Sequence, residues 1–484
     1  MSEKSLRRQA VQAGVYLTLR RVVGLVLSFI GLLYLTRLVG PNAYGAYTAA
    51  FSVIGYVLTV GAQGGRIYLI RQPENVAPSL FGLTFWWLFA AGIGAAALLS
   101  ATGVGLLAIG SRETQFATAL AWLASTLPLS LARGVPTALL ERQLDYSKLA
   151  IIEITGQLLI YIAGIPLALK GAGIWALIVG YICSELWQTL LIFSVARYRP
   201  HWCWDPALLR ESVSESLKMS AGAWMYELRR FGVPLVLLPL AGERAVGYYA
   251  LADRLIGALS FITSAIAQLS VPIYAKLQQR PQELLRAIYL SAQAQLLAYG
   301  SAAVGVLLIA PLVLPKLLGS QWDISVVVLT SAISSLHMML FVIFGPQAQA
   351  MYVIRKTSFM LWSNVLLIAC LFPFLWGFTW VIPAPYKPVG YMLGYMLAHQ
   401  PTNLLLHWAV KRWIGSPIYG ANLLWAVGLG AAMFAPFTHY WSLLGLLVFL
   451  HPASLRAARE VKALLLEARL SEKKGSQASD KNAV

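Results

Sequence analysis

Charged side chains lie within or beside stretches that are otherwise strongly apolar, and these are the residues whose chemistry needs explaining. An ionised group at the centre of a membrane costs at least about 2 to 3 kcal/mol unless it faces protein or water, so each is a functional candidate. Seven bases exceed four acids by three charges, and guanidinium forks suit phosphate oxygens, which favours an anionic ligand. The residues are Arg20, Arg21, Arg66, Arg133, Arg229, Arg230 and Arg254, with Glu153, Glu185, Glu227 and Asp253.

Composition excludes a soluble enzyme. Of 484 residues, 58% are hydrophobic and only 12% charged, and the mean hydropathy is +0.68, whereas soluble proteins carry about 25% charged residues. The net charge of +18 does not indicate nucleic-acid binding, because no soluble basic face is present. Three widely spaced cysteines and the lack of a phosphate-binding loop or metal motif predict no cofactor, no metal and no enzymatic activity.

Apolar runs long enough to cross about 30 Å of hydrocarbon recur along the whole chain. We expect fourteen spans, at 15–37, 44–70, 80–109, 114–140, 146–169, 171–196, 217–240, 245–275, 286–315, 323–353, 357–382, 388–410, 418–437 and 440–454. The predicted domains are an amphipathic N-terminal segment (1–14), a first six-helix lobe (15–196), a linker (197–216), a second six-helix lobe (217–410), two further spans (411–454), and an amphipathic helix with a disordered tail (455–484).

The positions of lysine and arginine test this count independently. With the N-terminus cytoplasmic, 27 basic residues fall on that side and six outside, as the positive-inside rule requires. We therefore expect a multi-pass protein of the cytoplasmic membrane with both termini inside.

The two halves contain a repeat. The segments 38–55 (LVGPNAYGAYTAAFSVIG) and 240–257 (LAGERAVGYYALADRLIG) align without a gap, with eight of eighteen positions identical. Six spans separate the copies, so both halves enter the membrane in the same direction and are related by an axis along the membrane normal. The expected fold is an all-α polytopic membrane protein whose two lobes enclose a central cationic cleft.

These repeat segments, with AQLSVPIYAKLQQRPQELLRAIY at 267–289, resemble the polysaccharide-transporter branch of the multidrug/oligosaccharidyl-lipid/polysaccharide exporter superfamily. The resemblance implies a flippase that moves a polyprenyl-diphosphate-linked oligosaccharide across the membrane by alternating access, for cell-surface polysaccharide synthesis. It implies this lipid-linked substrate, membrane lipids and polysaccharide polymerase or export machinery as partners. In relatives, arginines on the first, second and eighth helices are implicated in binding the lipid diphosphate.

Arg254, after the second repeat copy, is the strongest candidate for the substrate site, and Arg21 is its expected counterpart on the first helix. Arg21 shares a face with small residues, although a packing seam with arginines at the boundary explains that face equally well. The match fails on the second helix, where Ser52 aligns with Arg254. The other candidates are Arg20, Arg66, Arg229 and Arg230.

Acidic residues could carry a coupling sodium ion or proton, and the candidates are Asp253, Glu227 and Glu153. A structural partnership with arginine is the favoured alternative for each, and for Glu185. Glu227 and Arg230 are three residues apart and can pair on one helix. His337 is better explained as a polar contact than as a proton relay.

Two rival functions remain. A multidrug cation antiporter of the same superfamily would need acids in its cavity, whereas the balance here is positive and the first span has no acid. A membrane assembly factor without transport activity is the second rival, for which replacement of Arg254 would be without effect.

Overall fold

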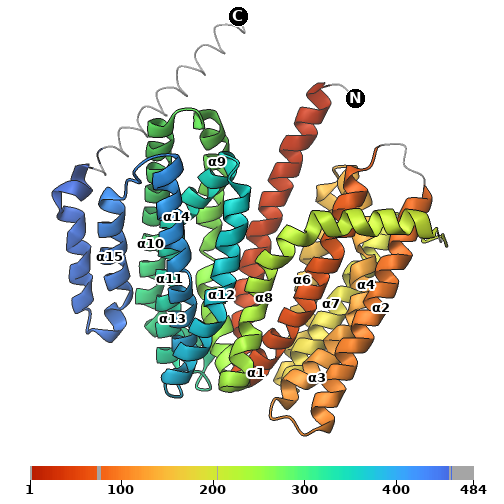
Figure 1. Ribbon diagram of the computed structural model, residues 1–484. Helices are drawn as coiled ribbons and strands as arrows, with labels where there is room; N and C mark the ends of the chain where they lie inside the picture. The colour runs from red at the N-terminus through yellow and green to blue at the C-terminus, as the bar shows by residue number, and fades with distance from the viewer. Residues whose placement is uncertain (1–2, 74–77, 204, 457–458, 460–484) are drawn as a thin grey trace, which may run out of the picture. The chain divides into compact units, whose positions relative to one another are not determined.

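The structure is a computed structural model that describes residues 3–73, 78–203, 205–456 and 459, without the side chains of 3–28, 62–64, 78, 218–226, 228–231 and 233. Its regular elements, in the described part, are all helices (Figure 1). This confirms the prediction of an all-α membrane protein. Two compact units are distinguished: unit 1 contains Met1–Arg254, Leu314–Val327 and Leu375–Tyr391, and unit 2 contains Leu255–Val313, Val328–Phe374 and Met392–Val484.

The first half of the chain forms α1 (Glu3–Arg71), α2 (Pro78–Ala108), α3 (Thr114–Leu123), the short 3-10 helix η1 (Ala124–Thr126), α4 (Leu127–Ala132), α5 (Gly134–Arg142), α6 (Tyr146–Leu169) and α7 (Ile174–Val195). The second half forms α8 (Pro206–Gly257), α9 (Ser260–Leu277), α10 (Pro281–Leu318), α11 (Ile324–Val353), α12 (Thr357–Val381), α13 (Lys387–Ala398), α14 (Gln400–Trp413), α15 (Gly420–Met433), η2 (Ala435–Phe437) and η3 (Trp441–Leu450).

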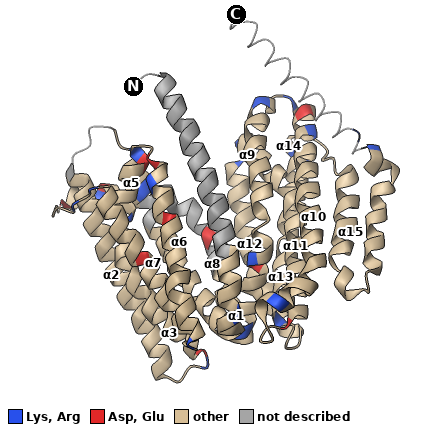
Figure 2. Cartoon of the chain, turned by 180° about the vertical axis from the view of Figure 1, so that it is seen from behind, with Lys and Arg blue, Asp and Glu red and all other residues tan. Residues whose placement is uncertain are grey.

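Every expected span coincides with helical structure, although the elements divide differently. Nine helices of the described chain, against fourteen expected spans, are long and apolar enough to cross a membrane. The number is lower because α1 and α8 each continue through two expected spans, the twelfth span is divided between α13 and α14, and α15 and η3 are shorter. The last expected span is the 3-10 helix η3 of ten residues, and a rise of about 2.0 Å per residue makes it roughly 20 Å long. In the ribbon of Figure 2 the positions of charged residues lie mainly near helix ends, as expected for spans.

The two copies of the repeat have the same backbone geometry. Gly40 in α1 has φ 79° and ψ 172°, and Gly242 in α8 has φ 79° and ψ 174°. This conformation is essentially restricted to glycine, so both helices turn sharply there. The repeat predicted from the sequence is confirmed at these turns.

Small residues allow the helices of unit 1 to approach closely. A Cβ at Gly31 of α1 would lie 2.7 Å from the ring of Tyr161 in α6, and one at Gly180 of α7 would lie 2.6 Å from the Ile160 carbonyl oxygen. Leu35 of α1 is buried in a hydrophobic cluster with residues of α6 and α7, and Tyr161 packs against this cluster. The small face of the first span is therefore, at Gly31, a packing surface for α6, as is usual between membrane helices.

Candidate functional site

Arg254 lies near the C-terminal end of α8 with an exposed side chain. Its guanidinium interacts electrostatically with Tyr44 and Tyr47 of α1, with Tyr161 of α6 and with the adjacent Asp253. These polar neighbours on α1 and α6 lower the cost of placing the Arg254 charge within a span. All these residues belong to unit 1.

Tyr44, Tyr47 and Tyr161 form an aromatic wall beside Arg254. Tyr44 is 3% exposed, and Tyr47 stacks on Phe51 with ring centroids 5.9 Å apart and planes at 15°. Phe51 in turn meets Tyr181 edge-on at 5.3 Å. Guanidinium and phenol groups all donate hydrogen bonds, and aromatic faces pack against sugar rings, so the arrangement suits a ligand with anionic oxygens and an attached apolar or carbohydrate part.

Polar and aromatic contacts close one end of unit 1 beside this site. Trp322 packs on Tyr248 (5.3 Å between centroids) and Tyr44 (6.3 Å). The Trp322 indole donates to the Thr36 carbonyl oxygen at 3.2 Å, and the Asp323 amide donates to the Tyr248 hydroxyl at 2.9 Å. The segment after α10 is thereby fixed to both repeat turns.

Arg66 is engaged by a carboxylate. Its guanidinium forms a two-pronged ion pair with Glu141 of α5, in which Nε donates to Oε2 at 2.6 Å. The neighbouring Arg142 donates to the carbonyl oxygens of Leu69, Gln72 and Pro73. Both arginines therefore hold the end of α1 against α5. In the described part of the chain the contacts of Arg66 are with Glu141 and do not include Arg254.

The remaining candidates are only partly described. The side chains of Arg20, Arg21, Arg229 and Arg230 fall outside the described residues, so their roles stay predictions. Glu153 of α6 and Glu227 of α8 are half-buried and each has polar or electrostatic partners. Asp253 is exposed beside Arg254.

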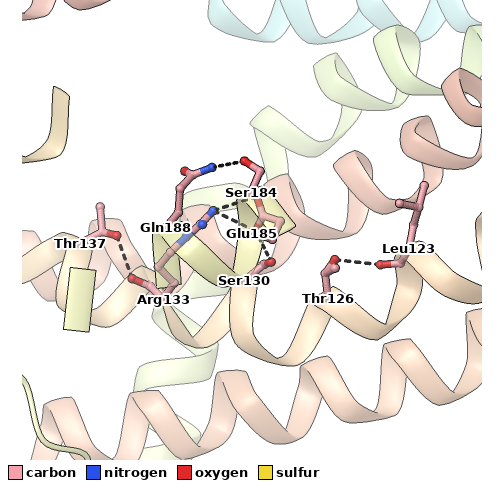
Figure 3. A network of polar contacts seen from close by, with 8 residues as sticks. All are labelled: Leu123, Thr126, Ser130, Arg133, Thr137, Ser184, Glu185 and Gln188. Atoms are coloured by element: carbon pink, nitrogen blue, oxygen red, sulfur yellow. Dashed lines mark hydrogen bonds and ion pairs between the residues drawn. The ribbon is translucent and has the colours of Figure 1, made fainter. Parts of the chain in front are cut away.

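A buried ion pair that the sequence did not connect lies between α4 and α7 (Figure 3). Arg133 Nη2 is 3.2 Å from Oε2 of Glu185, and Ser130 Oγ donates to the same oxygen at 2.5 Å. Glu185 is only 7% exposed. The favoured structural interpretation of this acid agrees with the contact, which neutralises both charges inside the span.

Breaks in the surrounding helix position this pair. Proline has no amide hydrogen, so Pro128 and Pro136 interrupt the ladder of the expected span 114–140, which is divided into α3, η1, α4 and α5. At the first break the Thr126 hydroxyl donates to the Leu123 carbonyl oxygen at 2.8 Å (Figure 3). Arg133 itself lies at the junction of α4 and α5.

The described helices, nine of which are long and apolar enough to cross a membrane, define a multi-pass helical membrane protein. The chain belongs to the polysaccharide biosynthesis protein family Polysacc_synt_3, whose model matches residues 34–327. It is 24% identical over 304 residues to the succinoglycan biosynthesis transport protein ExoT of Rhizobium meliloti (strain 1021). That match covers 61% of this chain and 60% of the relative, so the chain spans less than two thirds of that protein's length.

Solved structures share the fold. A lipid II flippase MurJ in an inward closed conformation matches with a TM-score of 0.64 and 14% identity, covering 94% of this chain and 100% of that one. An inward-facing multidrug resistance MATE family transporter of the MOP superfamily matches with a TM-score of 0.62 and 14% identity, covering 83% and 98%. The predicted two-lobe helical fold is thereby confirmed.

Proposed function

We propose that this protein is a flippase that translocates a polyprenyl-diphosphate-linked oligosaccharide across the cytoplasmic membrane, with both termini inside. Family membership supports a role in polysaccharide biosynthesis. The observation that carries the proposal is Arg254, an accessible arginine beside Tyr44, Tyr47 and Tyr161.

In this proposal the diphosphate binds to Arg254, whose fork can donate two parallel hydrogen bonds to phosphate oxygens. The phenols of the aromatic wall add donors or stack on the first sugar. The polyprenyl chain stays in the bilayer, and no covalent step occurs. Arg20, Arg21, Arg229 and Arg230, whose side chains lie outside the described residues, remain proposed phosphate ligands by their sequence positions. The membrane lipids and the polysaccharide polymerase or export machinery are the proposed partners.

The test is transport of a fluorescent lipid-linked oligosaccharide by the full chain in proteoliposomes, with accessibility to a membrane-impermeant glycosidase as readout. Arg254→Ala is expected to lower the initial rate about tenfold or more, because a hydrogen-bonded charge contact is worth about 1.5 to 3 kcal/mol. Arg254→Lys keeps the charge without the fork and is expected to fall between Ala and wild type.

The matched control is Arg280→Gln, because Arg280 is an exposed arginine with an ordinary surface partner, Glu283, at 3.4 Å. Its rate should equal that of the wild type. Absence of translocation by the wild-type protein under every ion gradient, or an unchanged rate for Arg254→Ala, would contradict the proposal. Uptake of an organic cation in place of the glycolipid would favour the antiporter alternative.

A further inference from the structure

Unit 2 contains almost no groups that can carry charge in its interior. Its described part has a single acid, Glu283, which is exposed in the first turn of α10. The bases lie at or near helix ends or in turns and are mostly exposed: Lys276, Arg280, Arg286, Arg355, Lys356, Lys411, Arg412, Arg456 and Arg459. Three histidines, His337, His399 and His407, lie in the interior of this part.

Two of these histidines are in contact. The rings of His337 in α11 and His399 lie 4.5 Å apart between centroids at 63°. Tyr395 of α13 contacts both, at 4.9 Å from His337 and 4.7 Å from His399. His399 is 7% exposed.

A main-chain contact determines which nitrogen of His399 can accept a proton. Nδ1 of His399 is 2.8 Å from the carbonyl oxygen of Tyr395. A carbonyl oxygen only accepts hydrogen bonds, so Nδ1 carries the hydrogen of the neutral ring and Nε2 holds the lone pair. Proton uptake at Nε2 converts imidazole to imidazolium without breaking the bond at Nδ1.

The charge of one imidazolium opposes protonation of the other, because the two rings lie in a low-dielectric interior. Tyr395 supplies a phenol, which stays neutral near pH 7. Other titratable side chains in the interior of the described part of unit 2 include the phenols of Tyr274, Tyr289, Tyr299 and Tyr419 and the thiol of Cys370. The Tyr419 hydroxyl is 2.8 Å from His407 Nδ1. Because the rings of His337 and His399 are in contact, repulsion between two imidazolium charges limits the pair to one added proton.

The pair also lies where a helix is interrupted. α13 ends at Ala398 and α14 begins at Gln400, with His399 between them and Pro401 in the first turn of α14. Pro401 has no amide hydrogen and so leaves the carbonyl oxygen of Leu397 without its usual helical donor. A charge placed at His399 acts at the position where this helix bends most easily.

We propose that His337 and His399 form a proton-binding site in unit 2 that holds one added proton and couples substrate translocation to the pH gradient. The coupling rests on the proposed flippase function, whereas proton binding does not. This site differs from the carboxylates Asp253, Glu227 and Glu153, which all lie in unit 1.

Proton binding is tested on the full chain in lipid nanodiscs with isotopically labelled histidine, following the imidazole nitrogen signals from about pH 5 to about pH 8. Six histidines are present, and His337→Gln, His399→Gln and His407→Gln assign the three interior ones. His337→Gln should move the titration midpoint of His399 by about one pH unit, as for directly interacting sites. His407→Gln, the matched control, should leave it in place. A midpoint of His399 that is unaffected by His337→Gln overturns the shared site.

Coupling is tested in the proteoliposome assay with and without a pH gradient at zero membrane potential. His337→Gln and His399→Gln should each lose most of the gradient-stimulated rate while keeping the rate without a gradient, and His407→Gln should retain both. A wild-type rate that responds to the gradient equally in all three variants overturns the coupling. If wild-type protein moves no glycolipid under any gradient, the flippase function fails, and the histidine titration still decides whether the proton site exists.

Discussion

Gly45 and Gly247, which occupy equivalent positions in the two repeat copies, cross each other backbone to backbone. A Cβ added at Gly45 would lie 2.5 Å from the Gly247 nitrogen and overlap the Glu243 carbonyl oxygen, and one at Gly247 would overlap the Pro41 carbonyl oxygen. Real Cβ atoms do not approach main-chain atoms so closely. The two repeats therefore meet through the glycines that they share.

Gly45→Ala and Gly247→Ala are each expected to destabilise the protein by about 1 to 3 kcal/mol, because overpacking forces backbone shifts. The measurement is the midpoint of thermal unfolding in nanodiscs. Gly257→Ala is the control on α8, since a Cβ there would meet no atom within 4 Å. Its midpoint should stay within error of wild type or rise, and a parallel fall in all three variants would contradict the close crossing.

The buried pair Arg133–Glu185 should be sensitive to removal of one partner. Glu185→Ala leaves Arg133 uncompensated inside the span and is expected to cost about 3 to 5 kcal/mol of stability. The double variant Arg133→Met/Glu185→Gln removes both charges and should recover much of the loss. The exposed pair Arg280–Glu283, at 3.4 Å, serves as control, and its removal should cost less than about 1 kcal/mol. Equal losses at both pairs would argue against burial of the first.

Arg66 is expected to act through Glu141. Arg66→Ala should lower the unfolding midpoint, and the charge exchange Arg66→Glu/Glu141→Arg should restore part of it, because the pair is re-formed in the reverse sense. Glycolipid transport per folded molecule should then remain near wild type for the exchanged protein. A transport loss in the exchanged protein with full recovery of stability would instead assign Arg66 to substrate binding.

Asp145 gives a stability contribution that depends on pH. It lies in the turn before α6, outside the spans, and its carboxylate accepts from the Ser147 hydroxyl at 2.9 Å and forms an ion pair with Lys148 at 2.6 Å. Partial burial acts to raise its pKa, but the hydrogen bonds from Lys148 and Ser147 outweigh that effect, so the pKa lies below the usual 3.8.

Because the folded pKa of Asp145 is lowered, its stabilisation is complete above the unfolded value of about 3.9 and is lost as the pH falls through the folded value. Asp145 is the N-cap of α6, and its side chain accepts a hydrogen bond from the Lys148 amide. Asp145→Ala should therefore lower the free energy of unfolding by about 1 kcal/mol at neutral pH. The difference from wild type should shrink below about pH 4. Unfolding midpoints measured at several pH values check this, and a difference that stays constant into acid would contradict it.

The sequence predicted the helices well because bilayer thickness sets their length and the repeat sets their order. The sharp turns at Gly40 and Gly242 could be anticipated from the repeat, since glycine at matching positions indicates a matching backbone conformation. The predicted boundaries failed chiefly where helices continue through a turn, as in α1, because hydropathy does not register a bend between two apolar runs.

Side-chain partnerships were less accessible. Arg133 and Glu185 were recognisable as charges in spans, but they are 52 residues apart, and only packing of α4 and α7 brings them together. The tyrosines around Arg254 were missed similarly, although Tyr47 belongs to the repeat match and could have directed attention there. Composition could have indicated the histidines, since residues 324–410, which contain all three, include no aspartate or glutamate.

The boundaries between the two units fall within helices, namely α8, α10, α11, α12 and α13, and in α10 and α12 they lie beside prolines. The boundary in α10 falls between Val313 and Leu314, flanked by Pro311 and Pro315, and that in α12 falls after Phe374, next to Pro373. Because proline has no amide hydrogen, a helix can bend at these residues without breaking a main-chain hydrogen bond. Pro311, Pro315 and Pro373 therefore each remove a main-chain hydrogen bond from α10 or α12, and these two helices can bend locally at those residues.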